Sequence, residues 1–142
     1  MVNQYVMKIY PAGCGREVYR NIEICGNNTL NQLCKVILDT FHFTDEHLYE
    51  FCMDNRMYSD DTYQSDPEGN EPSAEITIDD ANLFEGQKFS LHYDFGDDWM
   101  FTIKVLNINE VKKPFESRVI KEKGNVEQYP DFDEDDFDEE LW

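Results

Sequence analysis

The chain has 142 residues, 40% of them hydrophobic and 14% aromatic, and its formal net charge is −19. This length suits one domain that buries about two-thirds of its unfolded surface. Because no apolar run approaches the roughly 18 residues of a membrane span, and the start lacks the basic head and apolar run of a secretory signal, a cytoplasmic protein with no membrane segment is expected.

The first half of the chain predicts three strands and one helix. Alternating apolar residues indicate strands over residues 4–10 and 18–25, joined by a glycine-containing turn that favours antiparallel pairing. Thr29 is a good N-cap for a helix that runs to about Phe41, because its apolar residues recur at spacings of three and four. A third strand is expected over residues 48–53.

The second half predicts a mobile loop, a helical turn and three more strands. Residues 59–73 are polar, acidic and rich in Pro and Gly, so a loop is expected there. A capped helical turn follows at residues 77–80, with Leu83 and Phe84 expected to point inward. Regular alternation predicts strands over residues 88–94 and 99–108, and an edge strand over residues 118–123.

Together these elements predict an α+β fold, with a mixed, mainly antiparallel sheet packed against one main helix plus short helical turns. The predicted organisation is a single domain over residues 1–126, with the mobile acidic loop at about 59–73, and an acidic, disordered tail over residues 127–142.

The negative charge is concentrated in two segments. Nine acidic residues and no Lys or Arg lie between Met57 and Gly86, and nine more lie between Glu127 and Trp142. Direct binding to nucleic acid is disfavoured, because phosphate contacts need clustered basic residues. A basic protein surface is the expected partner. The tail also carries interspersed apolar side chains that suit a partner-binding segment: Tyr129, Phe132, Phe137, Leu141 and Trp142.

The four cysteines are expected to be reduced thiols packed as small apolar residues. No C-x-x-C pair is present, so a zinc site built on close pairs of ligands is disfavoured, and the chain is long enough to fold without disulfides.

Three stretches carry a resemblance to a known family. Residues 47–51, 89–99 and 124–130 occur in an order and spacing that resemble the Ri-plasmid open-reading-frame-three-like family, whose members are sometimes labelled as TnpR transposon passenger proteins. The resemblance runs from about residue 5 to about residue 133. Its most specific part is the hairpin of residues 93–99, with the signature residues Tyr93, Phe95, Gly96 and Trp99. The resemblance implies an α+β domain, associated with plasmids and mobile elements, whose biochemical role is largely uncharacterised.

One group of residues is the candidate ligand or metal site: His47, Glu50, His92, Asp94, Asp97 and Asp98. Short acids in a turn can coordinate a divalent cation through oxygen, helped by a histidine. The structural alternative is that they accept hydrogen bonds from backbone N–H groups and tolerate unusual dihedrals. No catalytic residue or required cofactor is assigned, because no nucleophile is marked out near the histidines.

Three functions therefore remain open. The first is a non-enzymatic protein-interaction module of a mobile-element-associated family. The second is an acidic nucleic-acid mimic that inhibits a DNA- or RNA-binding host-defence protein. The third is a small metal-dependent enzyme centred on His47, Glu50, His92 and Asp94, which requires a pocket joining these residues. The oligomeric state has no sequence signature.

Overall fold

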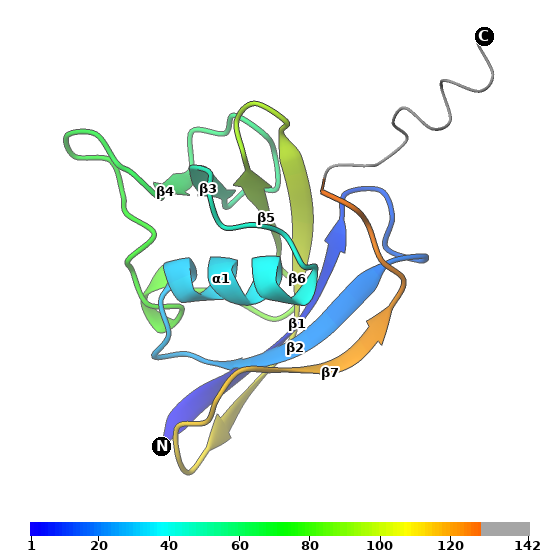
Figure 1. The fold of residues 1–142 in the computed structure, drawn as a ribbon. Helices are drawn as coiled ribbons and strands as arrows, with labels where there is room; N and C mark the ends of the chain where they lie inside the picture. Colours follow the sequence, from blue (N-terminus) through cyan, green and yellow to red (C-terminus); the bar gives the residue numbers. More distant parts are fainter. Residues whose placement is uncertain (129–142) are drawn as a thin grey trace, which may run out of the picture.

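A single antiparallel sheet dominates the computed structural model, which describes residues 1–128 (Figure 1). The sheet runs in the order β4-β3-β5-β6-β1-β2-β7, and every ladder in it is antiparallel. Its strands are β1 (Val2–Pro11), β2 (Tyr19–Cys25), β3 (Tyr49–Cys52), β4 (Thr62–Gln64), β5 (Lys88–Tyr93), β6 (Trp99–Val111) and β7 (Arg118–Lys123). Within residues 1–128, no helix has the length and apolarity to cross a bilayer.

The predicted α+β class is wrong, because the structure is a mainly-β fold. Residues 1–128 form seven strands but only one 11-residue helix, α1 (Leu30–Thr40), and one short 3₁₀ turn, η1 (Asp79–Ala81). The sheet is also not mixed, since its ladders are all antiparallel. The strand content was underestimated because β4 lies in a polar segment without apolar alternation, and β6 continues to Val111 through residues that are mostly polar.

Alternation along the strands places apolar side chains on one face of the sheet. Phe89, Leu91 and Tyr93 of β5 are fully buried on this face, while Ser90 and His92 point to the other. The same alternation puts Met7 and Ile9 of β1 into the core. Because buried side chains from β1, β2, β3, β5 and β6 meet in one cluster, the two faces of the sheet have different roles.

Helix α1 lies across the apolar face, as Figure 1 shows. It begins with a capping box in which Thr29 and Gln32 bond each other's backbone N–H groups. Its buried residues are Leu30, Leu33, Cys34, Ile37 and Leu38, and Phe41 beyond its end packs on Phe101 with ring centroids 5.0 Å apart. The helix therefore covers the part of the core next to the hairpin between β5 and β6.

The buried Arg20 joins segments that are far apart in sequence. Its side chain is 1% exposed and donates to the carbonyls of Thr40, Lys123 and Gly124. Its guanidinium also lies 4.6 Å from the centroid of the Phe41 ring. The end of α1 and the residues after β7 are thus held by one cation.

Local details of the acidic loop differ from expectation. Thr62–Gln64 forms β4, and the backbone N–H of Gln64 donates to Pro72 at 2.8 Å. Leu83 is buried as predicted, but Phe84 is 61% exposed rather than inward. Phe84 is exposed because the left-handed conformation of Asn82 ends the 3₁₀ turn and redirects the chain.

Candidate functional site

The hairpin between β5 and β6 is built around two aspartates with left-handed backbone. Asp94 has φ of 68° and Asp98 has φ of 52°, whereas Gly96 has ordinary dihedrals. Aspartate tolerates this conformation better than most residues. The Asp94 carboxylate accepts from the N–H of Gly96 at 3.0 Å, and the N–H of Asp98 donates to the Asp94 carbonyl at 2.6 Å. Asp94 therefore has a structural role in the turn.

The predicted site residues separate into two groups. In the first, Nε2 of His47 lies 3.5 Å from Oδ2 of Asp94. In the second, His92 lies between two carboxylates, with Nδ1 at 2.8 Å from Glu50 and Nε2 at 2.6 Å from Asp98. The Asp97 side chain contacts neither group in the part of the chain that the structure describes. Its backbone N–H donates to Oδ1 of Asp94 at 3.4 Å.

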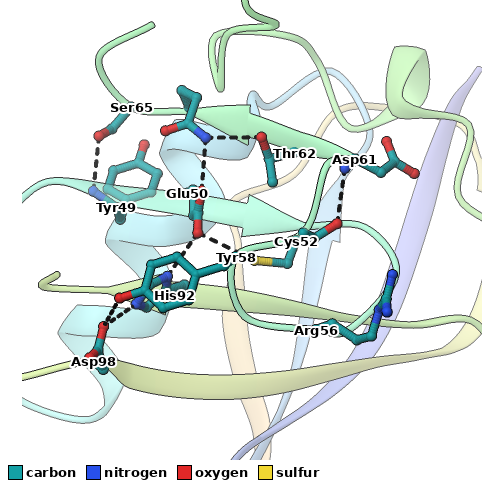
Figure 2. A network of polar contacts seen from close by, with 12 residues as sticks. Tyr49, Glu50, Cys52, Arg56, Tyr58, Asp61, Thr62, Ser65, His92 and Asp98 are labelled. Carbon is teal, nitrogen blue, oxygen red and sulfur yellow. Dashed lines mark hydrogen bonds and ion pairs between the residues drawn. The ribbon is translucent and has the colours of Figure 1, made fainter.

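His92 is at the centre of a larger hydrogen-bonded cluster, called here the His92 network and drawn in Figure 2. Glu50 of β3 and His92 of β5 are direct cross-strand neighbours, which is why their side chains meet. His92 is 0% and Glu50 7% exposed. The network consists of His92, Glu50, Asp98, Cys52, Tyr58 and Gln64.

Three members of this network were missed by the sequence analysis. Gln64 donates to Oε1 of Glu50 at 2.8 Å, Cys52 Sγ lies 3.7 Å from Oε2 of Glu50, and Tyr58 OH donates to Asp98 at 3.2 Å. The spacing of Cys52 two residues after Glu50 on a strand was a usable signal, because it puts both side chains on one face. Tyr58 and Gln64 come from the loop and β4, for which no pattern was available.

The pKa values in this region follow from burial and from the carboxylates. Burial, reinforced by the negative charge of Glu50, raises the pKa of the Cys52 thiol to about 12. The hydrogen bond to Asp98 raises the pKa of Tyr58, and burial raises that of Tyr93. Cys52 is thus a neutral thiol at pH 7 and can donate to Glu50.

Cys52 also belongs to a set of three potential metal ligands. The ligand atoms of Glu50, Cys52 and His92 all lie within 4.8 Å of one another, and all three residues are buried. Oxygen, sulfur and imidazole nitrogen together are typical of a zinc site. The four cysteines are free thiols, as predicted. Cys52 is not simply packed as a small apolar residue, because its thiol also contacts Glu50 and belongs to this ligand set.

Of the His92 network, Asp98 alone lines one of five surface pockets within residues 1–128. None of five pockets over residues 1–128 is lined by His47, Glu50, His92 or Asp94. Both ring nitrogens of His92 are already occupied by carboxylates. The pocket that the enzyme hypothesis requires is therefore not among these five.

Apolar side chains are exposed directly beside the network. Seven large hydrophobic residues are exposed within residues 1–128, and three of them, Leu48, Tyr58 and Phe95, surround this site. The rings of Tyr58 and Phe95 pack on the His92 ring with centroids 5.2 and 5.0 Å away. The Leu48 carbonyl accepts from the N–H of Asp94 at 3.0 Å. These three residues are called the hairpin patch.

The signature residues of the hairpin divide into buried residues and a residue exposed at the surface. Tyr93 is fully buried and bonds the Thr44 carbonyl, and its oxygen accepts from the N–H of Glu46 at 3.0 Å. Trp99 packs edge-on against Phe43 at 4.8 Å. Phe95 points outward, so this residue is available for contact.

The predicted partner-binding residues of the tail lie outside the described residues. These are Tyr129, Phe132, Phe137, Leu141 and Trp142. The nucleic-acid mimic depends on the same segment and stays a prediction.

The fold and the site define a mainly-β domain whose central hairpin is held by a buried histidine between two carboxylates. The chain matches the model of the plasmid pRiA4b ORF-3-like protein family over residues 3–133, and it belongs to this family. It is similar to the crystal structure of a protein of unknown function, MM3350 from Methanosarcina mazei Go1, with 27% identity and a TM-score of 0.66 over 84% of this chain and 67% of that chain. No curated protein matches the chain. The family resemblance inferred from the sequence is confirmed.

Proposed function

We propose that the protein is a non-enzymatic interaction module that binds a basic protein surface through the hairpin patch. The observation that carries this proposal is that Tyr58 and Phe95 are 69% and 41% exposed while both rest on the fully buried His92. An aromatic side chain that is exposed but held in one position provides contact area at a low cost in conformational entropy.

The charge around the patch supports a basic partner. Arg56 is the only Lys or Arg between Lys35 and Lys88, and it is paired with Asp54 at 2.9 Å. The hairpin adds Asp97, which is exposed. A partner with Lys or Arg around an apolar centre would complement this arrangement.

The network supports binding better than catalysis. A general acid or base must reach a substrate atom within hydrogen-bond distance. Each nitrogen of His92 instead contacts a carboxylate within the protein, and the ring is 0% exposed. This arrangement fixes the strands and the hairpin that present the patch.

Affinity capture with matched variants tests the proposal. The full chain carrying Tyr58→Ser and Phe95→Ser is compared with one carrying Phe84→Ser and Ile120→Ser, which removes two exposed apolar residues elsewhere. Both variants should keep the native circular dichroism spectrum. Proteins with basic surfaces that the native chain retains should be lost by the first variant alone, and more weakly retained at high salt. Equal retention by both variants would contradict the proposal.

Zinc binding is a second candidate function, favoured by the buried ligand set of Glu50, Cys52 and His92. Zinc would replace the proton of the Cys52 thiol, whose pKa is raised to about 12 in the metal-free protein. Zinc should therefore raise the melting temperature of the native chain and of Cys25→Ala, which removes a buried thiol outside the cluster, but not of Cys52→Ala. Equal zinc responses of the two variants, or no zinc response of the native chain, would exclude this site.

A further inference from the structure

The face of the sheet opposite α1 carries a row of lysines. Lys104 of β6 pairs in register with Lys88 of β5 on one side and with Lys8 of β1 on the other. Strands lie about 4.8 Å apart, so these three side chains are direct cross-strand neighbours. Beyond Lys8 the register continues through Asn21 to Lys121 of β7.

Such a row is unexpected in this chain. The protein has 31 acidic residues against 12 Lys and Arg, so acidic neighbours are abundant. Yet no lysine of the row forms an ion pair with any of residues 1–128. Within this range, the Lys and Arg residues paired with a carboxylate are Arg20, Lys35, Arg56 and Arg118. Like charges placed directly opposite on adjacent strands destabilise a sheet. No ion pair with a carboxylate of residues 1–128 offsets this repulsion at Lys8, Lys88 or Lys104.

The lysines line a concave surface rather than a flat one. Lys8, Lys88 and Lys104, together with Arg16 from the turn after β1, line a pocket of about 700 Å³. Glu17 is its one acidic residue. Thr102 and Tyr10 add hydroxyl groups to the same pocket. Four cations and two hydroxyl donors facing one cavity form an environment suited to several oxyanions.

Aromatic rings hold two of the lysines in place. The ammonium of Lys8 lies 5.5 Å from the centroid of Tyr10 and 4.7 Å from that of Tyr19. The ammonium of Lys121 lies 5.9 Å from the centroid of the same Tyr19 ring. These cation–π contacts orient the charged groups without neutralising them.

We propose that this pocket, called the lysine-row site, binds a compact polyanion carrying several phosphate groups. A short ligand fits the bounded cavity. Such a ligand is attracted mainly by the nearby lysines, because at physiological ionic strength the protein's acidic residues more than about 8–10 Å away are largely screened. A long nucleic-acid strand would extend past the pocket to the rest of a chain with net charge −19. The site is independent of the hairpin patch.

Titration calorimetry of the full chain with inorganic triphosphate tests the site. Triphosphate should bind more tightly than orthophosphate, and Lys8→Gln with Lys104→Gln should weaken binding at least tenfold. The matched control, Lys112→Gln with Lys113→Gln, removes the same charge from the turn between β6 and β7 and should bind like the native chain. Equal weakening in both variants, or no binding by the native chain, would overturn the proposal. Tighter binding of a single-stranded oligonucleotide than of triphosphate would overturn it in favour of a nucleic-acid surface.

Thermal unfolding, without and then with triphosphate, is a second test. Because the row repels itself, Lys104→Gln should raise the melting temperature of the free protein by about 1–3 °C, while Lys112→Gln should leave it unchanged. Triphosphate should stabilise the native chain but not the Lys104→Gln variant. A Lys104→Gln variant that melts below the native chain would refute the repulsion on which the proposal rests.

Discussion

Replacing His92 with leucine is expected to destabilise the protein by about 3 kcal/mol, mainly through Glu50. Glu50 is 7% exposed, and loss of its 2.8 Å contact with His92 leaves a buried carboxylate with only Gln64 and Cys52 as partners. Leaving a buried charged group without one of its hydrogen-bond partners costs about 1–3 kcal/mol or more. The Asp98 side chain is 37% exposed, so it regains water and adds little to this cost.

The double variant distinguishes this mechanism from simple loss of packing. His92→Leu with Glu50→Leu removes both members of the pair, so its destabilisation should be at least about 2 kcal/mol smaller than the sum of the single changes. Asp98→Asn is the control, because Asp98 is the partly exposed carboxylate partner of His92; it should lower the free energy of unfolding by less than about 1 kcal/mol. Urea unfolding followed by circular dichroism gives the free energies. Additive single changes, or a His92→Leu loss below about 1 kcal/mol, would refute the reasoning.

Other predictions concern Arg20, Gly124 and Cys52. Arg20→Lys should lower the free energy of unfolding by about 3 kcal/mol in urea denaturation, because an ammonium cannot span the carbonyls that the guanidinium reaches; a loss below 1 kcal/mol would contradict this. Gly124→Ala should lower the melting temperature sharply in calorimetry, because φ is 67° and a Cβ would lie 2.3 Å from the Glu17 carbonyl. Iodoacetamide at pH 8 should modify the half-buried Cys14 before Cys52, as mass spectrometry will show, because Cys52 is buried and its pKa is about 12. The Cys52 thiol ionises near pH 9 in the unfolded chain but only near pH 12 in the native protein. Its ionisation therefore favours the unfolded state, and the free energy of unfolding should fall as the pH rises from about 9 to 12.

Local pattern was sufficient to predict most of the individual elements. Thr29 and the periodic apolar residues after it predicted α1, and strict alternation predicted β5 and the first part of β6. The class was wrong because β4 and the end of β6 form by pairing with neighbours rather than by their own apolar pattern. Pairing partners come from tertiary structure, which a single sequence does not specify.

The candidate site was predicted in part for the same reason. His92 and Glu50 were named together, and the antiparallel register of β3 and β5 brings them into contact. The position of Tyr58 could not be predicted, because it depends on how the loop after β3 folds back to reach Asp98. The lysine row could not be predicted either, since Lys8 and Lys104 are 96 residues apart (104 − 8) and only the strand order aligns them.

Photocrosslinking from the hairpin patch tests the central claim most directly. A benzophenone side chain placed at Phe95, which is 41% exposed, should crosslink to a protein whose contact surface is basic. The same group at Phe84, which is 61% exposed on a different part of the surface, should not crosslink to that protein. Crosslinking from Phe95 alone, reduced by high salt, is the result that an interaction module predicts. The same crosslinked partner from both positions, or none from Phe95, would contradict it.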